Sequence, residues 1–202
     1  MQISIFTKET ILENDCVLLR PLQRNDFENL RQFAVNEPEI WKYSLVPASG
    51  EENLKQYIEQ AIVAREEEKE YPFIVIDKRS QAYAGSTRYY DIQLHQDTLQ
   101  LGYTWYGKDF QGTGLNLHCK FLLLQFAFDE IKMERVEFRA DADNARSIAA
   151  MKKIGCVEEG ILRNNLLKYG GGRRNSIVLS ILRSEWVDKV KDMLAARIAA
   201  SK

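Results

Sequence analysis

A chain of 202 residues with 45% hydrophobic and 28% charged residues has the composition of a globular protein, and its length fits one domain. The formal net charge of -1 gives no sign of a polyanion partner across the whole surface, although it leaves a local basic patch open. Cys16, Cys119 and Cys156 stand apart without metal-ligand spacing, which predicts reduced thiols, no metal site and a reducing compartment.

The sequence also predicts no export signal and no membrane span. Residues 1–13 lack a basic region followed by an apolar run. The longest apolar stretch, residues 121–128, contains Gln125 and is far shorter than the roughly 20 residues of a membrane helix. We therefore expect a cytoplasmic protein that does not bind membranes.

The first half of the chain predicts a strand, two helices and three further strands. A strand over residues 17–22 precedes a helix that begins at Asn25 and ends before Pro38. A second helix begins near Glu51. Three strand-like runs follow at residues 71–76, 81–92 and 98–106, spaced closely enough for an antiparallel meander.

The second half predicts a buried helix and then a mixture of strands and helices. The helix, over residues 115–131, is apolar on almost every face. The remaining predicted elements are a strand at 135–140, a helix from Asp143 or Asn144 to Gly155, a hairpin of strands 156–162 and 176–182, and a closing helix over 184–200. This order predicts one α/β (α+β) domain over residues 1–202, with a mixed, mostly antiparallel sheet of about seven strands flanked by helices.

The most informative segment is a loop with two glycines, residues 110–116, between a strand and the buried helix. Gly112 and Gly114 allow successive N–H groups to converge at the positive end of the helix, which suits phosphate. The loop lacks the Lys followed by Ser or Thr of a nucleoside-triphosphate loop and the third glycine of a dinucleotide fingerprint. An ordinary structural turn is the alternative for such a short motif.

Four segments of the chain resemble segments of the GNAT acetyltransferases, and in particular of the RimJ/RimL-type branch. They occur in the order that is typical of that family. Gln111, Gly114 and Asn116 occupy the positions of the family's coenzyme A loop, with Asn116 in place of a small residue. The other three segments are Leu19-Arg20-Pro21-Leu22 with Asp26, Asn144-x-x-Ser147 followed by residues 151–155, and residues 159–163, 172–174 and 180–186. The resemblance covers residues 17–186 and implies a GNAT-like single domain.

The resemblance implies acetyl-coenzyme A as co-substrate, bound through main-chain groups and without a metal. The implied pyrophosphate contacts are the backbone amides of Gln111, Gly112, Thr113, Gly114, Leu115 and Asn116. The implied pantetheine contacts are the main-chain groups of Tyr103, Thr104, Trp105 and Tyr106, which would pair with the arm as with an added strand.

Asn144 and Ser147 lie three residues apart and so share one helical face. The resemblance places them near the thioester as catalytic groups, with Asn144 binding the pantetheine and Ser147 donating a proton to the departing thiolate. Helix capping is the alternative for Asn144. Two interpretations stay open for four lysines, namely contact with coenzyme phosphates or ordinary solvation at the surface. These are Lys108, Lys120, Lys152 and Lys153.

Family members often carry a glutamate base on the strand before a Gly-Tyr pair, where this chain has Gln100. Asp91, Glu137, Asp141 and Glu159 are the substitutes that the sequence offers, and it does not rank them. The acceptor wall of the family corresponds to an early loop and the strand of residues 81–92. Its aromatic and basic candidates are Trp41, Tyr43, Arg88, Tyr89 and Tyr90, for which core packing is the alternative.

The expected function is transfer of acetyl to a primary amine, either a protein N-terminal α-amine or a small-molecule amine. Direct attack is favoured over a Cys nucleophile, because His95 and His118 complete no recognisable triad. The alternatives are a non-catalytic coenzyme A-binding domain, motivated by Gln100, and a nucleic-acid-associated protein. The basic loop of that third hypothesis comprises Arg163, Lys168, Arg173 and Arg174. Family members are often dimers, so a homodimer is compatible with the resemblance, while no nucleic-acid partner is expected.

Overall fold

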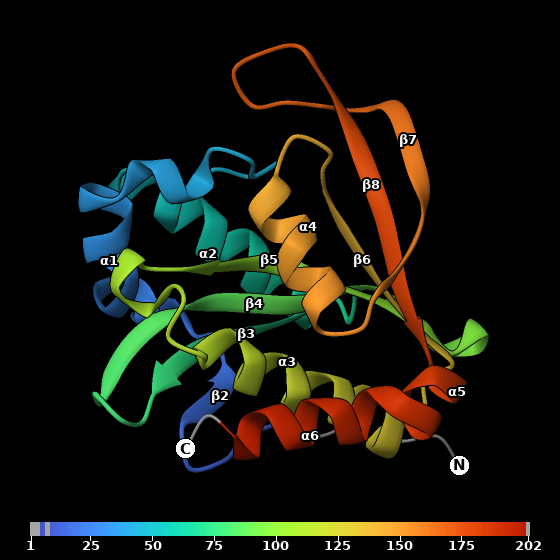
Figure 1. Ribbon diagram of the computed structural model, residues 1–202. Helices are drawn as coiled ribbons and strands as arrows, with labels where there is room; N and C mark the ends of the chain where they lie inside the picture. The colour runs from blue at the N-terminus through green and yellow to red at the C-terminus, as the bar shows by residue number, and fades with distance from the viewer. Residues whose placement is uncertain (1–4, 7–8, 201–202) are drawn as a thin grey trace.

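The computed structural model describes residues 5–6 and 9–200, which form one layer of sheet covered by helices on both faces (Figure 1). The described strands make a single sheet in the order β1-β2-β3-β4-β5-β6-β8-β7. Their bounds are β1 Leu12–Glu13, β2 Val17–Pro21, β3 Tyr71–Asp77, β4 Ala82–Gln93, β5 Thr98–Tyr106, β6 Arg135–Asp141, β7 Val157–Leu167 and β8 Arg173–Leu182. Every neighbouring pair is antiparallel except β5 and β6, which run parallel.

The helical segments connect these strands. The α-helices are α1 Phe27–Asn36, α2 Glu51–Glu66, α3 Leu115–Gln125, α4 Ala145–Lys153, α5 Arg183–Glu185 and α6 Lys191–Ala199. Short 3-10 turns lie at η1 Arg24–Asp26, η2 Pro38–Trp41, η3 Leu94–Gln96 and η4 Lys108–Phe110, and wider π-helical turns at η5 Phe126–Glu130 and η6 Trp186–Val190.

The sheet separates two hydrophobic cores. One lies under α3 and α6 and includes Phe128 and Trp186, whose rings stack at a centroid distance of 5.6 Å. The other lies under α1 and α2 and includes Phe33 and Trp105. Because side chains alternate across a strand, β3 contributes Phe73 to the first core and Ile74 to the second, whereas the described core residues of β6 and β8 belong to the first core alone.

A bulge in β5 reverses this alternation halfway along the strand. The register with β4 shifts between Ser86 and Arg88, and Tyr103 in the bulge has a φ of +49°. Before the bulge, Leu101 belongs to the α3 core, whereas beyond it Trp105 belongs to the α1 and α2 core. The bulge therefore turns the last residues of β5 relative to the rest of the strand.

The parallel pairing of β5 with β6 is brief. It covers only Thr98 with Arg135, Leu99 with Val136 and Gln100 with Glu137. Beyond these pairs β5 continues along β4 while β6 continues along β8, and Figure 1 shows the two strands diverging with α4 in front of the gap. Among the described residues, the end of β5 therefore has no partner strand on its β6 side.

The α/β class and the mostly antiparallel sheet are confirmed, with differences in detail. The sheet has one strand more than expected, because the two-residue β1 pairs with β2. The predicted helix start at Asn25 was wrong, because that residue lies in the turn η1 and α1 begins at Phe27. The predicted hairpin is longer on both sides, since β7 reaches Leu167 and β8 begins at Arg173.

The two long helices predicted near the carboxyl end are interrupted by π-helical turns. The helix expected over residues 115–131 ends as α3 at Gln125 and widens into η5, and the closing helix widens similarly in η6. In these turns Asp129 accepts hydrogen bonds from Trp186 Nε1 at 3.0 Å and Lys191 Nζ at 2.7 Å. These contacts join η5 to η6 and to the first residue of α6, where the chain departs from the regular helix that local periodicity predicts.

A buried ion pair fixes α1 to β2. The Asp26 side chain is 1% exposed and accepts two hydrogen bonds from Arg20, at 2.8 and 2.6 Å. It also accepts from the Gln23 main-chain N–H at 2.9 Å and from Asn29 Nδ2 at 2.8 Å. With both oxygens satisfied, this carboxylate sets the angle at which the chain leaves the sheet.

Replacing Asp26 should destabilise the whole domain. In Asp26→Ala the Arg20 guanidinium loses its counter-charge, and breaking a buried pair in this way costs about 3–5 kcal/mol. Urea unfolding measures the loss. Glu28→Ala, an exposed change in the same helical turn, is the control and should alter stability by less than about 0.5 kcal/mol. Similar unfolding midpoints for the two variants would contradict the anchoring role.

Candidate active site

The loop between β5 and α3 presents unpaired main-chain donors. Gly112 and Gly114 have φ values of +78° and +85°, and a Cβ placed on either would meet open space. Within residues 5–6 and 9–200, no hydrogen bond engages the N–H groups of Gly112, Thr113, Gly114 or Asn116. Because these donors stand at the amino end of an eleven-residue helix, they form a site for an anion.

Side chains hold this loop in place. Gln111 Nε2 donates to the Tyr106 carbonyl at 2.8 Å, and Gln111 Oε1 accepts from Arg146 on α4. Arg79 donates to the Thr113 carbonyl at 3.2 Å. The Gln111 side chain is thus occupied in positioning the loop, which leaves phosphate contacts to the main chain.

Two arginines lie beside the loop, and the sequence did not predict either of them. The basic residues that it suggested for phosphate contacts were lysines. Arg79 and Arg146 each bond to the loop, whereas Lys108 pairs with Glu39 and Lys152 pairs with Glu158. The arginines lie 34 and 35 residues from their loop partners. Sequence proximity therefore gave no signal for them.

The side chains of the expected pantetheine strand are mostly engaged in packing. The Tyr106 hydroxyl donates to Asn116 Oδ1 at 3.2 Å, which ties β5 to α3 and accounts for an asparagine at the last loop position. Trp105 is 7% exposed and packs on Trp41 at a ring distance of 5.1 Å. Thr104 Oγ1 is bonded to Thr87 Oγ1 at 2.7 Å. Contacts from this strand to a ligand therefore fall to its main chain.

Lys120 is a buried amine beside the same strand. It is 5% exposed, and its Nζ donates to Thr104 Oγ1 at 2.9 Å and lies 5.7 Å from the centroid of the Phe138 ring on β6. The alternative of ordinary solvation was wrong for Lys120, because the side chain is buried and bonded to β5. Burial lowers the pKa of Lys120 to about 8.

Asn144 and Ser147 share the first turn of α4, as their spacing predicts. Asn144 Oδ1 accepts from the Ser147 main-chain N–H at 3.1 Å, so Asn144 caps the helix. Among the described residues no hydrogen bond engages Asn144 Nδ2 or Ser147 Oγ. Both groups are half-buried, and each retains a donor for another molecule.

Gln100 occupies the expected base position together with a carboxylate. Its Nε2 donates to Asp91 Oδ2 at 2.7 Å, while its Oε1 is buried without a hydrogen-bond partner in the described part of the chain. Asp91 has a φ of +46° at an irregularity of β4 and accepts a second hydrogen bond, from Gln93. Both side chains that donate hydrogen bonds to Asp91 are therefore neutral amides rather than cations.

The other candidate carboxylates are held by basic side chains. Glu137 accepts from Arg135 and Arg139. The Arg135 guanidinium and the Ser180 hydroxyl hold the pKa of Glu159 down to about 2, which makes it a poor base. The Asp141 side chain pairs with Lys168 at 3.2 Å. Of the four candidate carboxylates, Asp91 is therefore the one that forms no ion pair with another described residue.

The residues predicted to form the acceptor wall divide into different environments. Tyr89 is fully buried and its hydroxyl donates to the Leu123 carbonyl of α3, so its assignment to the wall was wrong. Arg88 is 4% exposed and pairs with Glu70 at 2.5 Å, so its charge is already neutralised inside the protein. Tyr90 packs edge-on against Tyr103 at 5.1 Å.

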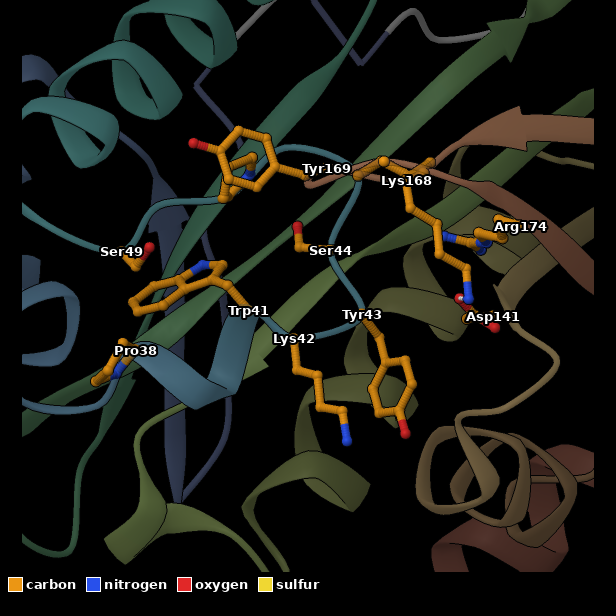
Figure 2. Close-up of a pocket in the computed structure, with 13 residues that line it drawn as sticks. Pro38, Trp41, Lys42, Tyr43, Ser44, Ser49, Asp141, Lys168, Tyr169 and Arg174 are labelled. Atoms are coloured by element: carbon orange, nitrogen blue, oxygen red, sulfur yellow. Dashed lines mark ion pairs between the residues drawn. The ribbon is translucent and has the colours of Figure 1, made fainter.

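Trp41 does line a cavity, together with Tyr43. The cavity has a volume of about 260 Å³ and lies between the loop after η2, the end of β6 and the β7–β8 turn (Figure 2). Its lining is Pro38, Trp41, Lys42, Tyr43, Ser44, Leu45, Pro47, Ser49, Asp141, Lys168, Tyr169, Gly171 and Arg174. Asp141 also accepts from the Asn144 N–H at its main-chain oxygen, so one turn builds both the cavity wall and the start of α4.

The basic loop of the nucleic-acid hypothesis is not a continuous surface patch. Arg174 is buried, and Lys168 is paired with Asp141 and Asp143. Arg173 is exposed and donates to the Asn164 carbonyl at 2.7 Å. Two of the four cations are therefore withdrawn from the surface that a polyanion would contact.

The sheet thus combines a parallel pair of strands that diverges with a helix amino end whose main-chain donors are unpaired among the described residues. The family model described as "Acetyltransferase (GNAT) domain" matches residues 17–157, and the chain belongs to this family. The GNAT domain implies acetyl-coenzyme A as its co-substrate.

Two curated relatives come from Bacillus subtilis. YjcK, named a "probable N-acetyltransferase", is 26% identical over 181 residues, which cover 87% of this chain and 98% of YjcK. YdaF, named a "putative ribosomal N-acetyltransferase", is 35% identical over 88 residues. That match covers 43% of this chain and only 46% of YdaF, so the chain matches less than half the length of that relative.

Solved structures agree with the fold. A structure from T. thermophilus titled a "putative acetyltransferase" superposes with a TM-score of 0.84 at 30% identity, covering 93% of this chain and 96% of that one. The ribosomal-protein-S5-alanine acetyltransferase of Vibrio fischeri superposes with a TM-score of 0.71 at 19% identity, covering 88% and 98%. The second likeness shows the fold alone.

Two searches of residues 5–6 and 9–200 gave negative results. None of the helices there combines the length and the apolar character needed to cross a membrane. Nor do three or more His, Cys, Asp or Glu side chains of those residues gather in an arrangement that could hold a metal ion.

The buried Lys120 amine should make stability depend on pH. Its pKa is about 8 in the folded protein, against 10.5 when unfolded, so the folded state binds fewer protons between these values and stability rises with pH across that window. The charged amine is therefore costly at pH 7. Its ionisable neighbours Cys119 and Cys156 have pKa values raised to about 12 by burial and stay neutral there.

Lys120→Met should be more stable than the wild type at pH 7, by up to about 3 kcal/mol less the lost Thr104 hydrogen bond. The difference should shrink between pH 8 and 10.5, as measured by urea unfolding at each pH. Lys153→Met, at an exposed position, is the control and should show no such trend. A variant that is less stable than the wild type at pH 7 would contradict a charged, uncompensated Lys120.

Proposed function

We propose that the protein transfers an acetyl group from acetyl-coenzyme A to a primary amine by direct attack of the neutral amine on the thioester. The observation that carries the proposal is the set of free N–H groups at the start of α3, directly beside the strand that β6 leaves unpaired. A diphosphate bound to these N–H groups and an extended arm bound along the unpaired edge of β5 would lie on one continuous path.

On the donor side, residues 111–116 would hold the pyrophosphate through main-chain N–H groups. Arg79 and Arg146 stand beside that loop. Arg79 is paired with Asp77 at 2.7 Å, so the added positive charge would come from Arg146. The main chain of Tyr103, Thr104, Trp105 and Tyr106 would bond the pantetheine arm. When bound, acetyl-coenzyme A supplies the activated thioester, and the residues of this chain orient it.

Asn144 and Ser147 are the proposed groups at the thioester. Asn144 Nδ2 is available to bond the arm, because capping uses only the Oδ1 atom. Ser147 Oγ is available as a proton donor to the sulfur that leaves. Their common place at the amino end of α4 adds the positive end of a nine-residue helix to the developing thiolate charge.

A covalent intermediate on cysteine is disfavoured. Burial raises the pKa of Cys119 and of Cys156 to about 12, so neither is a thiolate near neutral pH. Cys119 lies at the centre of the α3 core. These properties favour direct transfer over a two-step route.

The acceptor is proposed to be a protein N-terminal α-amine or a small-molecule amine, in line with the RimJ/RimL-type resemblance. An α-amine with a pKa near 8 is about 10% neutral at pH 7, whereas a lysine amine near 10.4 is about 0.04% neutral. Asp91, bonded to Gln100, is the weak base that the site offers. The word "ribosomal" in the name of YdaF supports a protein acceptor.

The alternative is a coenzyme A-binding domain without catalysis, and the buried amide of Gln100 at the usual base position favours it. Thiol release from acetyl-coenzyme A with a panel of N-terminal peptides, amino acids and polyamines separates the two. Turnover with any acceptor supports the transferase. Coenzyme A binding without turnover on the whole panel would support the binding domain instead.

Gly114→Trp should abolish binding of acetyl-coenzyme A, because an indole at this open position would cover the free amides at the start of α3. The positive φ costs about 1–2 kcal/mol of stability for a residue with a Cβ. Gly170→Trp, on the β7–β8 turn with a φ of +89° and open space, is the matched control and should bind normally. Equal affinities in calorimetry for the two variants would refute the phosphate site.

Ser147→Ala should lower kcat by about 10-fold or more while changing the affinity for acetyl-coenzyme A by less than about 2-fold, because the hydroxyl is proposed to act on the leaving sulfur. Steady-state kinetics and calorimetry measure the two effects. A parallel loss in affinity and kcat would make Ser147 a positioning residue rather than a proton donor.

A further inference from the structure

Arg174 is a buried cation without a partner. It is 6% exposed, and its Nε is fully buried with no hydrogen bond in the described part of the chain. Across residues 5–6 and 9–200, neither an ion pair nor a hydrogen bond engages any atom of its guanidinium. Burial lowers the pKa of Arg174, which is the direction expected for a charge withdrawn from water without compensation.

The nearest acid does not supply the missing counter-charge. Asp141 raises the pKa of Arg174, so it lies close enough to act on the guanidinium. Its oxygens are already used, however, because Oδ2 pairs with Lys168 at 3.2 Å and Oδ1 accepts from the Asp143 N–H at 3.0 Å. Arg139 adds a like charge that opposes the charged form of Arg174.

The guanidinium lines the cavity described above. Figure 2 places Arg174, Lys168 and Asp141 together on one side of it and Trp41 on the other. Lys168 forms ion pairs with both Asp141 and Asp143, which leaves Arg174 as the basic side chain on that side without an ion pair among the described residues. A volume of about 260 Å³ suits a group the size of one amino acid rather than a larger ligand.

The cavity that Arg174 lines adjoins β5. Trp41 lines the same cavity and packs on Trp105 of β5 at a ring distance of 5.1 Å. The turn that contains Asp141 leads directly into Asn144. The cavity therefore has one wall packed on the end of β5 and another wall in the turn that begins α4.

We propose that Arg174 binds a carboxylate of the acceptor, so that the amine acetylated here belongs to a molecule with a single negative group about one residue from the amine. The planar fork of arginine matches a carboxylate in a two-bond contact, and the guanidinium of Arg174 has neither a hydrogen bond nor an ion pair among the described residues. This inference rests on the proposed acetyl transfer. The carboxylate comes either from a free amino acid or from an acidic first residue of a peptide.

The test uses matched acceptors and matched variants. The acceptors are free amino acids against their carboxamides, and peptide amides beginning with Asp or Glu against those beginning with Asn or Gln. Thiol release is measured for the wild type, Arg174→Gln, Arg174→Lys and, as control, Arg173→Gln, whose side chain is exposed on the neighbouring position. Thermal shift with the same carboxylates, without acetyl-coenzyme A, reports binding independently of turnover.

The wild type should prefer a carboxylate acceptor over its amide by about 10- to 100-fold in kcat/KM, as expected for a charge-assisted contact. Arg174→Gln should remove that preference through KM and leave the amide unaffected, Arg174→Lys should restore part of it, and Arg173→Gln should behave as the wild type. A preference among the free amino acids identifies the carboxylate as that of a free amino acid. A preference among the peptide amides identifies it as the side chain of an acidic first residue.

Each contrary outcome has a separate meaning. Turnover without a preference for carboxylates, or an equal loss for both acceptors in Arg174→Gln, overturns the inference and leaves the transferase function intact. A carboxylate-dependent thermal shift that requires Arg174, without turnover on any acceptor, supports the anion site and contradicts the transferase. Absence of both the preference and the shift overturns the inference.

Discussion

The whole arrangement depends on the early end of hydrogen bonding between β5 and β6. Only three residue pairs join these parallel strands, although each strand continues well beyond them. Main-chain groups inside a sheet require partners, so a strand edge released in this way is a site for another extended chain. The bulge at Tyr103 and the divergence of β6 toward β8 together create that edge.

The neighbouring elements act on the same gap. The loop before α3 places unpaired N–H groups at one end of it, while α4 places Asn144 and Ser147 in front of it. Among the described residues, two buried cations lack carboxylate partners: Lys120 bonds to Thr104 of β5, and Arg174 lines the cavity whose Trp41 packs on Trp105 of β5. Uncompensated buried charge costs stability, and proteins retain such costs mainly where function needs them.

The sequence predicted those features that local patterns determine. Alternation and helical spacing located the strands and helices, and Gly112 and Gly114 marked the loop. It did not predict the bulge, because Tyr103 at a positive φ is a residue that local rules place in regular strand. Nor did it predict the π-helical turns, which depend on contacts of Asp129 with residues 57 and 62 positions away. Arg174 faces inward because it shares the buried face of β8 with Ser176. The sequence alone did not show which residues of β8 lie on that face.

Amide hydrogen exchange with and without coenzyme A tests the central claim most directly. Binding should slow exchange about tenfold or more at Gly112, Thr113, Gly114 and Asn116, and also at amides of β5 beyond Gln100, while amides of β1 and β2 keep their rates. If coenzyme A binds but leaves the amides of this loop unprotected, the diphosphate lies elsewhere and the account of the site is wrong.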